Sequence, residues 1–222
     1  SMVSDTSDVE QVLLGDQGVI TTIQPGALVI DMSTIDPAAS QTIYQQFQAR
    51  QVDFLDAPVS GGDVGAINAT LTIMVGGDDA AFQRALPVFD CLGKSTTHIG
   101  ASGAGQICKA CNQILVASNV MGVCEALGLA AANDIELKPL VEALGGGAAQ
   151  SWQLDNLGPA IIDNQLDPGF MIELLAKDLR IVKEALEKAG TVADSSNRAK
   201  QLFDDLAAQG DGRLGTQALV KA

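Results

Sequence analysis

The stretch that most constrains the fold of this chain is residues 103–132, a long apolar segment. From Gln106 to Ala132 it contains no proline and only two glycines, Gly122 and Gly128. Ala, Leu, Val, Ile, Met and Cys occupy nearly every face of the expected helix, which indicates that the helix is mostly buried. At about 1.5 Å per residue it would span about 40 Å. In a chain of 222 residues, a helix of that length is expected to join parts of the molecule.

Two polar side chains near the start of this helix, Lys109 and Asn112, are three residues apart and therefore share a face. A lysine is misplaced at a helix N-terminus, because the helix dipole favours anions there. Either the side chain extends to solvent, the commoner arrangement for a helical lysine, or it projects into a cleft. In a cleft, burial and the dipole would lower its pKa toward the range useful for proton transfer. The spacing leaves both interpretations open.

Composition limits the classes of partner. Hydrophobic residues make up 47% of the chain and charged residues 18%, which is typical of a globular protein. The formal net charge is -14 and no run of Lys or Arg occurs, so we expect neither nucleic acid nor an anionic membrane as a partner. The long apolar segment is interrupted by Lys109, Asn112, Asn119 and Glu125, which argues against a membrane span.

The chain has four cysteines, Cys91, Cys108, Cys111 and Cys124, and one histidine, His98. Cys108 and Cys111 form a C-x-x-C, but a zinc or redox site would need a turn or a second pair. Inside a long apolar helix we interpret them as small core residues in a reducing compartment, the cytoplasm. We expect no metal site.

The first hundred residues show the pattern of an α/β sheet. Continuous apolar or β-branched runs predict strands at 27–32, 52–57, 70–76 and 96–99, with helices at 37–50 and 78–92. This is the order of half of a twisted α/β sheet. Ligands of such sheets bind beyond the carboxyl ends of the strands, and Thr34 and Ser60 directly follow two of these ends.

The remainder is predicted to be helical, with segments at about 137–144, 150–164, 172–189, 192–209 and 214–221. The composition changes from β-rich to helical near Gly103. In the helix at 172–189, Lys177 and Asp178 precede an amphipathic run, and their spacing alone favours a solvated helix face.

The sequence contains few of the common catalytic or cofactor-binding motifs. No G-x-G-x-x-G lies between a strand and a helix, Gly103-x-Gly105 does not fit that fingerprint, and no P-loop or nucleophile elbow occurs. Ser60-Gly61-Gly62 offers a hydroxyl and two unobstructed backbone N–H groups, which suit a carboxylate. Lys109 could deliver or remove a proton, and Asn112 could hydrogen-bond both a substrate and that lysine.

Five motifs in order resemble those of one family. DMSTIDP (31–37), DAPVSGG (56–62), TLTIMVGG (70–77), GAGQICKACNQ (103–113) and KDL (177–179) resemble the signatures of the β-hydroxyacid dehydrogenases. That family includes 3-hydroxyisobutyrate dehydrogenase, tartronate semialdehyde reductase and the glyoxylate/succinic semialdehyde reductases. The resemblance covers essentially the whole chain.

The resemblance implies an α/β plus all-α fold. A partial Rossmann-like sheet in residues 1–102 would be the C-terminal part of an NAD(P)-binding domain, and residues 103–222 would be an all-helical substrate and dimerisation domain built on the long helix. It also implies transfer of a hydride between NAD or NADP and a small carboxylate-bearing semialdehyde or hydroxy acid. Lys109 matches the general acid and base of the family and Asn112 its catalytic asparagine. The substrate-binding residues that match are Ser60, Gly61, Gly62, Phe170 and Asp178, and the cofactor-binding ones are Thr34 and Lys177.

The sequence departs from the family pattern in two places. Family members begin with a βαβ unit that carries G-x-G-x-x-G, whereas this chain starts at what resembles the end of the fourth strand, about 60 residues later. Ala69 stands where the family usually has glycine. A chain without the first unit would hold an incomplete cofactor site and be inactive by itself.

Two alternatives to a complete dehydrogenase of this family are considered. The chain could be a catalytically incomplete oligomerisation module, and in either case the apolar excess of the helical part favours a homodimer or tetramer. A decarboxylating relative of 6-phosphogluconate dehydrogenase, whose C-terminal domain is similar, is disfavoured because no cluster of Arg and His is present to hold a sugar phosphate.

Overall fold

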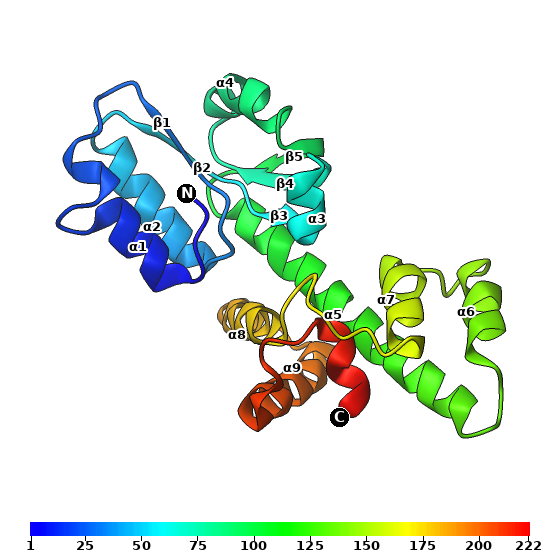
Figure 1. The fold of residues 1–222 in the computed structure, drawn as a ribbon. Helices are drawn as coiled ribbons and strands as arrows, with labels where there is room; N and C mark the ends of the chain where they lie inside the picture. The colour runs from blue at the N-terminus through cyan, green and yellow to red at the C-terminus, as the bar shows by residue number, and fades with distance from the viewer. The chain divides into compact units, whose positions relative to one another are not determined.

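A computed structural model describes all 222 residues, which divide into two compact units (Figure 1). The first unit comprises Ser1–Cys111 with Glu187–Ala189, and the second comprises Asn112–Leu186 with Gly190–Ala222. The boundary falls inside helix α5, Ala104–Ala131, so this helix contributes residues to both units. The length of the apolar segment therefore correctly predicted a helix that joins two parts of the chain.

The first unit is a five-stranded sheet with helices. Its strands are β1 (Leu28–Asp31), β2 (Asp53–Asp56), β3 (Val59–Ser60), β4 (Leu71–Gly76) and β5 (Gly93–Gly100). Its other elements are α1 (Thr6–Leu14), a 3₁₀ turn (Val19–Thr21), α2 (Pro37–Gln48), α3 (Gly62–Ile67) and α4 (Asp79–Phe89). All four expected strands are present. The sequence did not indicate β3 or α3. A two-residue strand such as β3 exists only through its pairing, here with β4.

The sheet combines two parallel pairs. β1 pairs with β2 from Leu28↔Asp53 to Asp31↔Asp56, and β4 pairs in parallel with β5. β2 and β4 meet at a single antiparallel pair, Asp56↔Gly76. Because β1 and β2 are parallel and in register, the loops that follow them leave the same edge of the sheet.

Side chains of β1 and β2 alternate between two hydrophobic clusters, as strands covered on both faces require. Val29 and Phe54 pack with α1 and α2, where the rings of Phe47 and Phe54 stack with centroids 5.8 Å apart. Leu28 and Leu55 pack in the other cluster, with α4. The continuous apolar runs of the sequence therefore correctly predicted strands that are buried on both sides.

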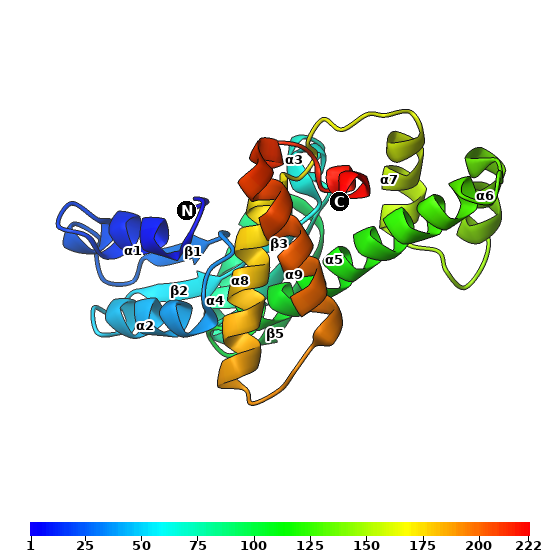
Figure 2. The ribbon, with the colours of Figure 1, turned by 90° about the horizontal axis from the view of Figure 1, so that it is seen from below.

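The second unit consists of helices around the C-terminal part of α5. They are α6 (Leu137–Gly145), α7 (Trp152–Ile162), α8 (Ile172–Lys188), α9 (Asp194–Leu206), a π-helical turn (Ala207–Asp211) and a 3₁₀ helix (Thr216–Lys221). Two apolar clusters hold them together. One joins α5, α8, α9 and the last 3₁₀ helix, and the other packs α6 and α7 against α5 (Figure 2).

Helix α5 is also long and apolar enough, by length and composition alone, to cross a membrane, with 28% of its most apolar window buried. The core helix of a globular protein passes the same test. Several large apolar side chains on it are exposed, among them Leu115 and Leu129, so the prediction of a mostly buried helix is wrong for the chain by itself.

Ala69 provides a test of local strain. Its φ is 53°, a left-handed conformation that costs a residue with a Cβ about 1 kcal/mol and that glycine adopts freely. We expect Ala69→Gly to raise the free energy of unfolding by about 0.5 kcal/mol, since part of the gain is offset by the greater freedom of glycine in the unfolded chain. Urea unfolding measures the change. The matched control is Ala66→Gly inside α3, which should lower stability by about 1 kcal/mol; a loss at both positions would contradict this account.

Candidate active site

The candidate site of the first unit lies at the edge of the sheet where β1 and β2 end. The segment after β1 carries Thr34, and the segment after β2 leads to Ser60. The N-terminus of α5 is bound to the same edge. The carboxylate of Asp56 accepts hydrogen bonds from the backbone N–H of Gly103 at 2.7 Å and of Gln106 at 3.1 Å. Asp56 therefore satisfies donors that the first turn of a helix leaves without partners.

The glycines before and within the start of α5 permit this close packing. A Cβ at Gly105 would lie 2.5 Å from the carbonyl oxygen of Met74 and 2.7 Å from that of Asp56. A Cβ at Gly76 would lie 2.7 Å from both carboxylate oxygens of Asp56. Gly103 has a φ of 90°, which favours glycine. The Gly103-x-Gly105 pair thus brings the helix into backbone contact with the sheet.

Lys109, one turn further along α5, is buried, with 7% of its surface exposed. Its Nζ donates a hydrogen bond to the carbonyl oxygen of Val59 at 2.8 Å. Of the two arrangements that the sequence left open, the structure shows the buried one, and it places the amine beside the residue that precedes Ser60.

The segment Ser60-Gly61-Gly62 turns sharply from β3 into α3. Gly61 and Gly62 have φ values of 139° and 64°, which residues with a Cβ rarely adopt. Both glycines are exposed, and Ser60 is half-buried. The main chain of both glycines is therefore accessible to solvent.

Burial raises the pKa of Asp56 to about 6, and the hydrogen bonds from Gly103 and Gln106 oppose that rise. The carboxyl group is fully buried, so the cost of desolvating the charge exceeds what the N–H groups return. Asp56 is a residue that sequence reasoning missed. Its position at the end of a strand is visible in the sequence, but the helix terminus it contacts is 47 residues away.

The predicted site residues of the second unit form a buried polar chain. The amide of Asn112 donates to Gln113 at 2.7 Å, and Gln113 donates to the carboxylate of Asp178 at 2.6 Å. Lys177 forms an ion pair with the same carboxylate at 2.7 Å. Asp178 is 3% exposed, so the interpretation of Lys177 and Asp178 as a solvated helix face is wrong, because an amphipathic pattern cannot reveal which neighbour covers a charge.

Phe170 is half-buried and packs against the core cluster of α5, α8 and α9. Its carbonyl oxygen accepts a hydrogen bond from Thr216 at 3.0 Å. The predicted residues thus fall into two groups. Thr34, Ser60, Gly61, Gly62 and Lys109 belong to the first unit, and Asn112, Phe170, Lys177 and Asp178 to the second. Lys109 and Asn112 are linked by one turn of α5.

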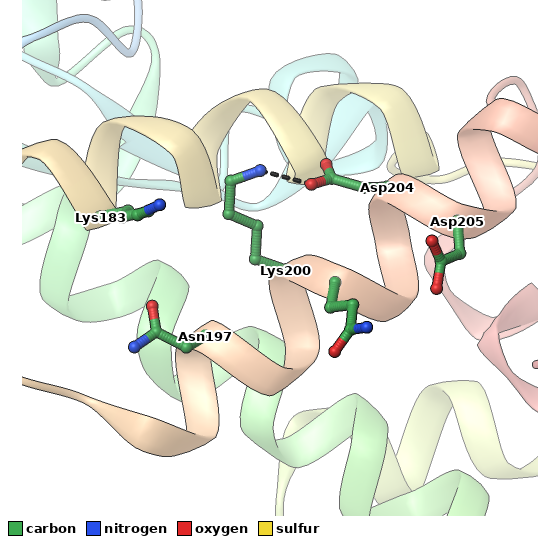
Figure 3. A pocket seen from close by; sticks show the side chains of 6 residues that line it. Lys183, Asn197, Lys200, Asp204 and Asp205 are labelled. Carbon is green, nitrogen blue, oxygen red and sulfur yellow. Dashed lines mark hydrogen bonds and ion pairs between the residues drawn. The ribbon is translucent and has the colours of Figure 1, made fainter.

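An open pocket of about 400 Å³ lies elsewhere, between α8 and α9 (Figure 3). It is lined by Lys183, Asn197, Lys200, Gln201, Asp204 and Asp205. Lys200 pairs with Asp204 at 2.5 Å across one turn of α9, which is an ordinary surface ion pair. None of the predicted site residues lines this pocket, so we assign it no role in the chemistry.

The cysteines are all free thiols, but Cys111 is exposed and Cys108 is half-buried, so the interpretation of this pair as core residues is wrong. Burial raises the pKa of the Cys124 thiol to about 12 and, with the neighbouring Cys111, raises that of Cys108. Both shifts disfavour the reactive thiolate. No group of three or more His, Cys, Asp or Glu side chains is arranged to hold a metal ion.

Comparison with known proteins gives the family. Residues 1–100 match the NAD binding domain of 6-phosphogluconate dehydrogenase, and residues 103–222 match the NAD-binding domain of NADP-dependent 3-hydroxyisobutyrate dehydrogenase. A 2-hydroxy-3-oxopropionate reductase of Escherichia coli is 40% identical over 221 residues, which is 100% of this chain and 76% of that protein. The chain belongs to the β-hydroxyacid dehydrogenase family.

Other β-hydroxyacid dehydrogenases agree with this assignment. An NAD-dependent L-serine dehydrogenase of Pseudomonas aeruginosa is 38% identical over 95% of this chain and 73% of its own length. The solved structure of a Mycobacterium tuberculosis 3-hydroxyisobutyrate dehydrogenase with L-serine superposes with a TM-score of 0.91 at 30% identity, covering 99% of this chain and 77% of the other. The partial Rossmann-like sheet and the helical second part are therefore the fold of this family, and the chain is an oxidoreductase by family.

The matches to NAD-binding models support NAD or NADP as the cofactor of this β-hydroxyacid dehydrogenase. Dinucleotides bind such sheets beyond the carboxyl ends of parallel strands. Here that edge carries half-buried Thr34 on a segment fixed to α5, with buried Lys109 on the same helix. These residues fit the reactive end of a nicotinamide cofactor.

The raised pKa of Asp56 predicts a pH dependence of stability. Because its pKa in the folded chain, about 6, exceeds the ordinary value of 3.8, protonation stabilises the folded state. This contribution is complete below about pH 4 and is lost as the pH rises through 6. Each pKa unit corresponds to about 1.4 kcal/mol, so the free energy of unfolding relative to Asp56→Asn should fall by about 2 kcal/mol from pH 4 to pH 7. Urea unfolding of both chains measures it, and a pH-independent difference would contradict the prediction.

Proposed function

We propose that this chain interconverts a small carboxylate-bearing semialdehyde or keto acid and the corresponding hydroxy acid, using NAD or NADP. The observation that carries the proposal is the buried amine of Lys109, fixed to the carbonyl oxygen of Val59 immediately before the Ser60-Gly61-Gly62 turn. When bound, the nicotinamide supplies or accepts the hydride. The residues of the chain supply the binding of the substrate and the movement of the proton.

Lys109 is the proposed general acid and base. In reduction its ammonium group gives a proton to the carbonyl oxygen of the substrate, and in oxidation its neutral amine takes the proton from the hydroxyl. Burial favours the neutral amine, and so does a position near the positive end of the α5 dipole.

The turn at Ser60, Gly61 and Gly62 is the proposed site of the substrate carboxylate. Backbone N–H groups in a turn of positive-φ glycines form a concave anion site that no side chain covers, and the hydroxyl of Ser60 adds a donor. A carboxylate held here lies next to Val59, whose carbonyl group holds the amine of Lys109. Carboxylate recognition and proton transfer would then be neighbouring functions.

The other predicted residues receive supporting roles in this proposal. Asn112 orients the substrate, and Phe170 and Asp178 line its site. Thr34 lies beside the nicotinamide, and Lys177 lies beside the cofactor, fixed by its ion pair with Asp178. This ion pair leaves the buried carboxylate of Asp178 without an uncompensated charge.

The relatives indicate the size of substrate to test. One is a 2-hydroxy-3-oxopropionate reductase and another an L-serine dehydrogenase. Both names describe three-carbon acids with a polar group on carbon 3. We therefore propose short 3-hydroxy acids or 3-oxo acids, with glyoxylate and succinic semialdehyde as further probes.

Self-association and location complete the proposal. We infer a homodimer or tetramer in the cytoplasm, with no membrane and no nucleic acid as partner. Four free thiols support a reducing compartment, and a net charge of -14 disfavours polyanions. Leu115 and Leu129 on α5 are 64% and 69% exposed, an arrangement that a second copy of the chain would bury.

The alternative, a non-catalytic oligomerisation module, is favoured only by these exposed apolar residues. Titration of the chain with NADH and NADPH, followed by the fluorescence of Trp152, distinguishes the two. Micromolar binding with turnover supports the dehydrogenase. A folded oligomer that binds neither cofactor supports the module.

Substitution of Lys109 tests the mechanism. We expect Lys109→Ala to lower kcat by at least about 100-fold, since removal of a general acid or base costs 10²–10⁴-fold. Circular dichroism and thermal unfolding should remain close to those of the unaltered chain. Turnover of the three-carbon substrates is measured by the absorbance of the reduced nicotinamide.

Lys138→Ala is the matched control, because Lys138 is an exposed lysine on α6 that pairs with Asp163. It should leave kcat and KM unchanged. If Lys109→Ala kept the full kcat in a folded chain, Lys109 would have no part in proton transfer.

Charged substitutions on α5 test self-association. We expect Leu115→Glu combined with Leu129→Glu to shift the chain to a monomer, because burying two unpaired carboxylates would oppose assembly. Size-exclusion chromatography with light scattering measures the mass. Val192→Glu, at an equally exposed valine away from α5, is the control and should leave the mass unchanged. An unaltered mass of the double variant would place the interface elsewhere.

A further inference from the structure

One buried side chain of α5, Gln106, joins the helix to the segment that follows β1. It is 1% exposed. Its Oε1 accepts a hydrogen bond from the backbone N–H of Ile35 at 3.1 Å, and its Nε2 donates one to the carbonyl oxygen of Ser33 at 2.8 Å. Both bonds span more than 70 residues of sequence. A single amide thus binds the main chain on both sides of Thr34.

The same residue is fixed at its own main chain. The N–H of Gln106 donates to Asp56, which also caps Gly103. The position of the amide therefore follows from the docking of α5 on the end of β2. Three residues further along the helix, Lys109 binds Val59. Gln106 and Lys109 consequently connect the first turns of α5 to the segments after β1 and β2, respectively.

Both partners of Gln106 are main-chain groups in a buried place, where a donor or acceptor without a partner costs about 1–3 kcal/mol. Only a side chain with one donor and one acceptor at this length satisfies both. A residue needed merely to fill the space could be apolar. The amide donates to Ser33 and accepts from Ile35, so it holds the backbone on both sides of Thr34 in one conformation.

We propose that Gln106 is a positioning residue, which keeps Thr34 in a fixed position relative to Lys109 and so aligns the nicotinamide with the proton-transferring amine. This inference rests on the proposed function, because it takes Thr34 to lie beside the nicotinamide. It assigns Gln106 no contact with substrate or cofactor. Its effect on the reaction passes through the segment that carries Thr34.

Two substitutions separate the hydrogen bonds from the packing. Gln106→Met has nearly the same length and removes both hydrogen bonds at every pH. Gln106→Glu keeps the acceptor for Ile35, but its carboxylate cannot donate to Ser33 and faces that carbonyl oxygen. A protonated glutamic acid donates through its hydroxyl group and restores both bonds. Burial raises the pKa of such a group, so the restoration should occur as the pH falls from 8.5 to 5.5.

The experiment measures kcat, the KM of substrate and cofactor, and the hydrogen-exchange protection of the Ile35 amide in the full chain between pH 5.5 and 8.5. For Gln106→Met we expect protection and kcat to fall at least about tenfold at all pH values, since small misplacements of reacting groups cost up to about 100-fold. The KM of the substrate should stay within about twofold. The kcat of Gln106→Glu should match that of Gln106→Met at pH 8.5 and recover to within about threefold of the unaltered chain at pH 5.5, while its retained acceptor keeps the Ile35 amide protected at every pH.

Values are compared with the unaltered chain at each pH, which removes the titration of neighbouring Asp56 from the comparison. Gln41→Met is the control, because Gln41 also donates to the loop before α5, at Ser102, without contacting the segment from Ser33 to Ile35. Its kcat and Ile35 protection should be unchanged.

Two results would overturn the proposal. One is Gln106→Met with an unchanged kcat per folded molecule, whether or not its thermal stability falls. The other is Gln106→Glu with no recovery of kcat at low pH although the Ile35 amide is protected. Absence of turnover in the unaltered chain overturns the proposed function instead, and Ile35 protection then still decides whether Gln106 holds the segment.

Discussion

The first unit depends on the contact between the carboxylate of Asp56 and the N-terminus of α5. A helix begins with N–H groups that have no partner inside the helix, and here the end of a strand supplies the acceptor. The contact is possible only because Gly76 and Gly105 lack side chains, since a Cβ at either would approach its neighbours within 2.8 Å. The hydrogen bonds from the start of the helix to the carboxylate of Asp56 therefore depend on glycine at positions 76 and 105.

This contact fixes the positions of the residues that follow it on α5. Gln106 reaches the segment after β1, and Lys109 reaches the segment after β2. The cost is visible at Asp56, whose burial raises its pKa to about 6. A protein that needed only stability would not bury a carboxyl group there. We interpret the lower stability that we expect at neutral pH as the consequence of holding these two segments and the amine in fixed positions.

The second unit also contains a buried carboxylate held by several donors, but here the donors are side chains instead of main-chain N–H groups. Asn112, Gln113 and Asp178 form a continuous buried chain of hydrogen bonds that ends at Lys177. Every member has a partner, which is the condition under which a buried polar network makes its surroundings rigid. The exposed Leu115 and Leu129 lie on α5, the helix that also carries Asn112 and Gln113. One long helix thereby carries the residues to which we assign proton transfer and substrate orientation, together with the surface that we propose for assembly.

The sequence by itself determined the strands, the long helix, the family and the candidate residues, because periodicity and short motifs involve residues that are close together in the sequence. It did not determine β3, the burial of Asp178, or the parts played by Asp56 and Gln106. Each of these depends on partners that are distant in sequence, such as Ser33 and Ile35 for Gln106. Spacing along one helix reveals which residues share a face, but only the tertiary structure decides what covers that face, because burial and hydrogen bonding are properties of the packed chain.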